Sequence, residues 1–225
     1  MYTGKCDCLG VEIHMEFSMI QRLPFFPNKH RICRGLACLK ESFLGLDFSL
    51  PDRMYDRKRN DGAMYVVTPK NTLKEAFDCV DLKKYPRIID IGCGKGYVLW
   101  QAKKYGFAKV GGIEYDEKLW KICVRNMKRL GIDRDVTVAH EDARTFSGYG
   151  DYDVFYFFNP FVEEVMNQVI GQIIEQCKGR QIMVIYYRPR YTDRIEGCGY
   201  FQKICIFEDS AKGYSANIYL GRIPE

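Results

Sequence analysis

The sequence lacks an apolar run long enough to cross a bilayer, and it contains no internal repeat and no low-complexity stretch. A membrane-spanning helix needs about 20 predominantly apolar residues, so we do not expect this chain to enter a membrane. The first residues also lack the basic and then apolar pattern of a secretion signal, and we therefore expect a cytoplasmic protein. The three histidines, His14, His30 and His140, are scattered and indicate neither a metal site nor a catalytic triad.

Zinc-binding cysteine motifs are absent as well, although the chain has ten cysteines. Two pairs are close in sequence, Cys6 with Cys8 and Cys33 with Cys38, but neither has the C-x-x-C spacing typical of zinc sites. Disulfide frameworks are typical of secreted proteins, and no secretion signal is present. The sequence therefore predicts free thiols and no bound metal.

Length and charge set broad limits. The chain has 225 residues, of which 47% are hydrophobic and 28% charged, and this suits one well-buried α/β domain with an N-terminal extension. The formal net charge is +5. So small a basic excess is compatible with an anionic partner such as RNA, but it is more typical of an ordinary solvated surface.

The pattern divides the chain near residue 80. Residues 1–80 show no regular alternation and are interrupted by prolines, so we expect an extension or lid before the main domain at 81–225. Within the extension, the charged segment 53–61 indicates a loop. Residues 73–80 are predicted to form a helix whose start is capped by Asn71 and Thr72.

From Tyr85 onwards, apolar strand patterns alternate with helical ones. The expected strands are 87–91, 109–114, 136–140, 152–158, 181–187, 204–207 and 216–221, and the expected helices are 97–105, 117–130 and 162–177. This alternation favours an α/β fold with a doubly wound, Rossmann-like, mostly parallel sheet of seven strands, of which the last two form an antiparallel hairpin. In such folds, ligands bind at the carboxyl ends of the strands.

A glycine-rich turn follows the first strand directly, in the sequence Asp-Ile-Gly-Cys-Gly-Lys-Gly at 90–96. Glycines allow positive φ angles and let a ligand approach the backbone, and amides at the start of the next helix face that ligand. Dinucleotide-binding loops place their third glycine where this chain has Tyr97, and a carboxylate in the loop would repel a pyrophosphate. Asp90 instead favours a cationic amino-acid group, such as that of S-adenosylmethionine. The predicted cofactor contacts in this turn are Asp90, Gly92, Cys93, Gly94 and Gly96.

A second carboxylate, Glu114, ends the next strand, 24 residues after Asp90. A carboxylate at this point of a doubly wound fold can accept both hydroxyl groups of a ribose. After the third strand, the sequence Glu-Asp-Ala at 141–143 supplies an acid that can reach an adenine amino group or cap the next helical turn. The further predicted cofactor contacts are Glu114, Tyr115, Asp142 and Ala143.

The fourth strand ends in Phe-Phe-Asn-Pro-Phe at 157–161. The Asn159 amide oxygen and the Pro160 carbonyl can accept the N–H groups of an amine and aim its lone pair at a methyl group. Phe161 can wall the site and exclude water. The alternative is an Asn-Pro turn that only ends the strand. We predict Asn159, Pro160 and Phe161 as catalytic residues, with Asn159 also contacting the cofactor.

Together, these motifs over residues 85–190 resemble the class I S-adenosylmethionine-dependent methyltransferases. The resemblance implies that Asp90, Gly92 and Gly94 contact the methionine side of S-adenosylmethionine, Glu114 its ribose and Asp142 its adenine. The glycine turn and the Phe-Asn-Pro-Phe sequence look most like those of small bacterial proteins related to the non-SET histone-lysine methyltransferases. Residues 65–69 also resemble the segment that those enzymes place over the cofactor.

The sequence leaves the methyl acceptor open, and it does not indicate the oligomeric state. The resemblance favours a protein amine such as lysine. Enzymes that methylate the amino groups of adenine or glutamine use Asn/Asp-Pro-Pro-Tyr/Phe, and this chain is one proline short of that motif. RNA, DNA and small molecules therefore stay open as acceptors, as does a non-catalytic cofactor-binding module.

Overall fold

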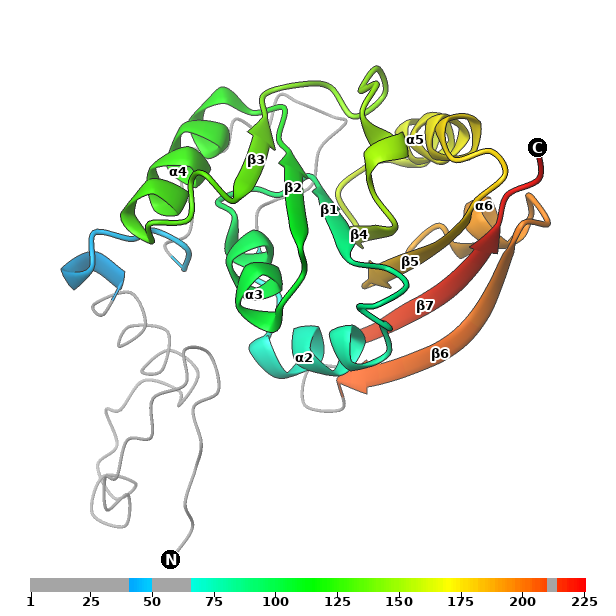
Figure 1. Ribbon diagram of the computed structural model, residues 1–225, viewed down its shortest axis with the longest axis horizontal. Helices are drawn as coiled ribbons and strands as arrows, with labels where there is room; N and C mark the ends of the chain where they lie inside the picture. The colour runs from blue at the N-terminus through cyan, green and yellow to red at the C-terminus, as the bar shows by residue number, and fades with distance from the viewer. Residues whose placement is uncertain (1–40, 50–65, 210–213) are drawn as a thin grey trace, which may run out of the picture.

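The computed structural model describes residues 41–49, 66–209 and 214–225, which form a twisted sheet flanked by helices (Figure 1). The strands are β1 (Arg87–Ile91), β2 (Lys109–Ile113), β3 (Val136–Ala139), β4 (Val154–Phe158), β5 (Gln181–Tyr187), β6 (Phe201–Asp209) and β7 (Tyr214–Arg222). Their order in the sheet is β3-β2-β1-β4-β5-β7-β6. The first five are parallel, and β7 is antiparallel to both of its neighbours. The predicted seven-stranded, doubly wound sheet with a C-terminal hairpin is confirmed.

The helices lie on both faces of this sheet. They are α2 (Lys70–Asp78), α3 (Tyr97–Tyr105), α4 (Glu117–Arg129), α5 (Glu163–Gln176) and α6 (Thr192–Glu196), with a short 3-10 turn, η2 (Tyr149–Asp151). Side chains of α2, α3 and α4 pack in the core on one face, and those of α5 and α6 in the core on the other (Figure 1). The bounds predicted for α3 match, whereas α6 was missed because its five residues carry too short an apolar pattern.

The central strand β4 shows why the sequence folds in this way. It lies between β1 and β5, and its side chains alternate between the two faces. Val154 and Tyr156 pack in the core shared with α2, α3 and α4, while Phe155 and Phe157 pack in the core shared with α5. All four are buried, which is why this strand has no polar face.

The start of α2 corrects one prediction. The helix is preceded by Pro69, and no side chain caps it. The Pro69 carbonyl accepts a hydrogen bond from the N–H of Leu73, with a distance of 3.1 Å between N and O. Because the first turn forms on this bond, Asn71 and Thr72 lie inside the helix instead of capping it.

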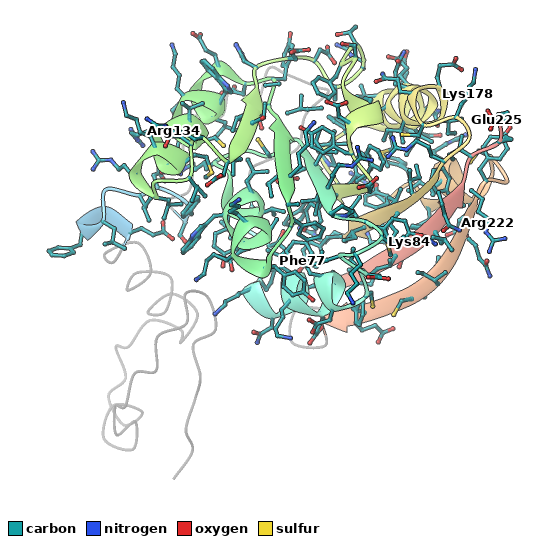
Figure 2. All side chains as sticks on the ribbon, viewed as in Figure 1. Phe77, Lys84, Arg134, Lys178, Arg222 and Glu225 are labelled. Atoms are coloured by element: carbon teal, nitrogen blue, oxygen red, sulfur yellow. The ribbon has the colours of Figure 1, made fainter. Side chains whose placement is uncertain are left out.

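Part of the expected extension packs in the main core. Phe77 of α2 lies between α2 and α3 (Figure 2), and its ring contacts Phe107 edge-on at 5.3 Å between centroids. Phe48, in the segment 41–49, is fully buried and stacks on Trp100 of α3, with 5.5 Å between ring centroids and 2° between planes. These residues are therefore part of the same folded unit as the sheet.

The described residues contain neither a membrane-spanning helix nor a metal cluster. None of the described helices is both long and apolar enough to span a membrane. Within 41–49, 66–209 and 214–225, no three His, Cys, Asp or Glu side chains lie together as a metal site requires. The predicted loop 53–61 and the pairs at Cys6, Cys8, Cys33 and Cys38 lie outside the described residues.

Candidate cofactor site

A cavity opens at the carboxyl ends of β1, β2 and β4. Between β1 and β4 the order of the strands reverses, which is where doubly wound folds bind their ligands. Eight of the predicted cofactor contacts line this cavity, together with two predicted catalytic residues: Asp90, Gly92, Cys93, Gly94, Glu114, Tyr115, Asp142, Ala143, Pro160 and Phe161.

The glycine turn forms the floor of the cavity. Gly92 and Gly94 have φ angles of 83° and 54°, a backbone region that favours glycine. The N–H groups of Gly92 and Cys93 both donate to the Ile113 carbonyl at 2.9 Å, which ties the turn to β2. A Cβ atom at Gly92 would lie only 2.8 Å from Cβ of Pro160, so the turn and the residues after β4 are in close contact.

Asp90 is a buried carboxylate that faces the cavity. Its exposed fraction is 4%, and none of the described residues donates a hydrogen bond to its side chain. Burial raises the pKa of Asp90 well above its ordinary value, and the nearby Glu114 raises it further. A buried carboxylate needs hydrogen-bond donors or a cation to remain ionised, so this position suits a ligand that brings a positively charged group.

Glu114 is also buried, but its oxygens have partners. One oxygen, Oε2, accepts from the N–H of Gly94, and the other, Oε1, accepts from the N–H of Asp116, each at 2.8 Å. Burial raises the pKa of Glu114, while these backbone N–H groups lower it. Tyr115, which follows it, is about half exposed at the cavity wall. The Glu114 carboxylate is thus fixed between the glycine turn and the start of α4.

Asp142 lies after β3 at the far end of the cavity. Its oxygens accept from the Arg144 guanidinium, with 3.0 Å to Nε, and from the backbone N–H of Arg144 at 2.9 Å. This hydrogen bonding lowers the pKa of Asp142. The Tyr149 hydroxyl donates to the Ala143 carbonyl at 2.6 Å and holds the loop in place. Arg144, which also lines the cavity, was missed because a single arginine after an acid has no distinctive pattern.

Two predicted site residues do not line the cavity, as far as the described residues define it. Gly96 precedes α3, and a Cβ there would lie 2.5 Å from Sγ of Cys123, so this glycine faces the core beside α4. The Asn159 side chain turns toward β5, where its Oδ1 accepts from the Tyr186 hydroxyl at 3.4 Å. The neighbours of Asn159, Phe158 and Pro160, do line the cavity.

The segment before α2 closes another side. Val66, Val67 and Thr68 line the cavity, and the Thr68 hydroxyl is 2.7 Å from the hydroxyl of Tyr156 in β4. The resemblance to non-SET lysine methyltransferases predicts this segment over a cofactor. Its position in the wall agrees with that expectation.

The strand order, the glycine turn after β1 and the carboxylate after β2 are those of a doubly wound domain that binds a nucleoside at its switch point. The family described as methyltransferase domain matches residues 88–179. The chain is 31% identical over 129 residues to a protein-L-isoaspartate O-methyltransferase of Thermotoga maritima, and the aligned stretch covers 56% of this chain and 40% of that protein. It is also 36% identical over 61 residues to a ribosomal protein L11 methyltransferase of Thermotoga neapolitana, and this aligned stretch covers 27% of this chain and 22% of that protein.

Solved structures share the fold. An RNA methyltransferase from Salinibacter ruber, crystallised with S-adenosyl-L-homocysteine, superposes with a TM-score of 0.52 and 20% identity, covering 71% of this chain and 95% of that chain. The chain spans less than half the length of the curated relatives it matches. These matches show that residues 88–179 are similar to a methyltransferase domain and that the chain has the fold of solved structures crystallised with S-adenosylmethionine or S-adenosyl-L-homocysteine.

Proposed function

We propose that the chain binds S-adenosylmethionine in this cavity and transfers its methyl group to an amine, with a protein lysine as the favoured acceptor. The observation that carries the proposal is the Asp90 carboxylate, which is buried at the cavity without a hydrogen-bond donor among the described residues. The ammonium group of S-adenosylmethionine supplies the positive charge that such a carboxylate requires.

The other contacts follow from the chemistry of the side chains. Glu114 would accept the ribose hydroxyl groups, and Asp142 would accept the adenine amino group, while Gly92 and Gly94 leave room beside the backbone. When bound, the cofactor supplies a methyl group that is already activated, so the protein mainly provides alignment and a dry site. Val66–Thr68 belong to the expected extension, and their place in the wall supports its proposed role as a lid.

The acceptor side of the cavity is apolar. Phe158, Pro160 and Phe161 line it, and these groups would exclude water from the reacting nitrogen. An apolar wall disfavours the charged form of a lysine, so it lowers the pKa of the amine and helps to release the proton. The names of the two curated relatives, which refer to protein acceptors, support a protein over a nucleic acid.

Labelling tests the acceptor class. The full chain is incubated with S-adenosylmethionine carrying a tritiated methyl group and with cell lysate, and the label is divided among protein, nucleic acid and metabolites. We expect the label in protein, on lysine after hydrolysis. Label in RNA or DNA would overturn the protein acceptor, and tight binding without any transfer would indicate a non-catalytic cofactor-binding module.

Calorimetry tests the cofactor site. Asp90→Ala and Glu114→Ala should each weaken the binding of S-adenosylmethionine by about 1–3 kcal/mol, because each removes a polar partner in a buried site. Asp151→Ala is the matched control, since this exposed carboxylate pairs with Lys109 at the opposite end of the strands. Unchanged affinity in both site variants would remove the assignment of the cavity to this cofactor.

A further inference from the structure

The ends of β4 and β5 share an unusual backbone feature. The two strands are paired up to Phe158 and Tyr187, and the next residue in each chain segment has a positive φ angle. These residues are Asn159, with φ of 40°, and Arg188, with φ of 51°, and no other described non-glycine residue has a positive φ. Such a conformation is costly for residues other than glycine and persists only where the surrounding structure holds it.

The hydroxyl group of Tyr186 lies between the two turns. Tyr186 is buried in β5, and its hydroxyl donates to Oδ1 of Asn159 at 3.4 Å and accepts from the N–H of Arg190 at 3.3 Å. Burial raises the pKa of Tyr186, and hydrogen bonds from the N–H groups of Arg190 and Tyr191 lower it. One hydroxyl group therefore connects the turn after β4 with the loop after β5.

The connection continues to the floor of the cavity. Asn159 is followed by Pro160, whose ring lies against Gly92 so closely that a Cβ there would approach it to 2.8 Å. The Tyr186 ring itself is fixed by an edge-on contact with Phe157, at 6.0 Å between centroids. The position of the acceptor wall relative to the glycine turn thus depends on a chain of contacts from Tyr186 through Asn159 to Pro160.

We propose that Tyr186 is a positioning residue for methyl transfer, which acts through Asn159 to hold Pro160 and Phe161 as the wall that orients the acceptor. This inference rests on the proposed function and adds to it a residue that does not touch the cavity. It also assigns Asn159 a role that differs from the one predicted from the sequence. Its amide oxygen accepts the hydrogen bond from Tyr186, and Asn159 affects the acceptor by fixing the position of the turn.

The test removes only the hydroxyl group. Tyr186→Phe keeps the ring and its contact with Phe157, so we expect S-adenosylmethionine affinity within twofold of the wild type. The rate of label transfer at saturating cofactor, into the lysate fraction that the wild type methylates, should fall about 10- to 100-fold, because small misplacement of reacting groups is costly. Tyr85→Phe is the matched control, since its buried hydroxyl donates to Gln181 at the opposite end of β5, and it should transfer at the wild-type rate.

A double-mutant cycle separates positioning from general damage. If Tyr186 acts through Asn159, then Asn159→Ala should lower the transfer rate to a similar extent, and the double variant should be no slower than the slower single variant. Multiplied rate losses in the double variant would overturn the proposal, as would a Tyr186→Phe protein that transfers normally or loses cofactor affinity. If Tyr186→Phe unfolds, Asn159→Ala removes the same hydrogen bond from its acceptor side. A normal transfer rate of the Asn159→Ala variant would then overturn the proposal.

The wild-type chain tests the proposed function independently of the inference about Tyr186. The proposed function fails if the wild-type chain binds no S-adenosylmethionine or labels no fraction of the lysate. If the wild type does both and the Tyr186→Phe variant matches it, the inference about Tyr186 fails and the proposed function stands.

Discussion

The ammonium group of Lys95 and the carboxylate of Asp47 form an ion pair with 2.7 Å between Nζ and Oδ1, and the Lys95 side chain is only 3% exposed. Asn126 of α4 reinforces this pair, because its amide donates to the carbonyls of both residues at 2.9 Å. Lys95 belongs to the glycine turn, so the segment 41–49 is connected directly to the floor of the cofactor site. The segment 41–49 therefore supports the site as well as packing against the core.

Removal of the Asp47 carboxylate should destabilise the whole domain. Asp47→Ala takes the ion pair from a buried ammonium group, and we expect the free energy of unfolding to fall by about 3 kcal/mol. Urea denaturation of the full chain measures this change. Glu175→Ala removes the carboxylate of an exposed pair with Lys178 and should change the same quantity by less than about 1 kcal/mol. Equal effects of the two substitutions would contradict a structural role for the Asp47 pair.

The contact between Gly92 and Pro160 gives a second prediction. Gly92→Ala should weaken cofactor binding and slow transfer, because the new methyl group meets the Pro160 ring and the φ of 83° is unfavourable for alanine. The control is Gly171→Ala in α5, where a Cβ meets no atom within 4 Å. This change should raise the free energy of unfolding by about 0.5–1 kcal/mol and leave binding unaltered. Calorimetry and urea denaturation of both variants check the two expectations.

Much of the fold could be predicted because its signals are local. The strands β1 and β5 and the helix α3 have the bounds expected from apolar runs and from the glycines at their ends. Most of the predicted cofactor contacts line the cavity for the same reason, since Asp90 lies near the end of β1 and Glu114 directly follows β2, and parallel strands end at one edge of the sheet. The local sequence pattern predicts the bounds of an element where the apolar spacing and the turn residues indicate the same ends.

The contacts that sequence reasoning missed join residues far apart in the chain. Asp47 and Lys95 are 48 residues apart, and nothing in either segment indicates that they pair. The hydrogen bond between Tyr186 and the Asn159 amide oxygen was missed for a similar reason, because Tyr186 lies on the neighbouring strand and is 27 residues away in sequence. Gly96 was included as a cofactor contact because glycine turns are read as a unit, although its Cα faces Cys123 of α4.

The buried carboxylate of Asp90 leads to a prediction about pH. Burial, with a smaller effect from Glu114, raises the pKa of Asp90 in the folded chain well above its value in the unfolded chain. Between these two pKa values the folded chain holds one more proton, so the free energy of unfolding should fall as the pH rises through this window. Asp90→Asn should remove this fall and stabilise the cofactor-free protein above the window, because no charge is then buried.

The same residue should couple cofactor binding to proton release. A cationic ligand beside Asp90 favours the ionised carboxylate, so S-adenosylmethionine should bind more tightly as the pH rises through the window, and binding within it should release a proton. Calorimetric titrations in two buffers with different ionisation enthalpies count the protons released. Asp90→Asn should release fewer protons than the wild type, whereas Asp151→Ala should release the same number, because Asp151 is exposed and far from the cavity. An equal number of protons from the wild type and Asp90→Asn would mean that the bound cation does not meet Asp90, and the orientation of the cofactor would have to be reversed.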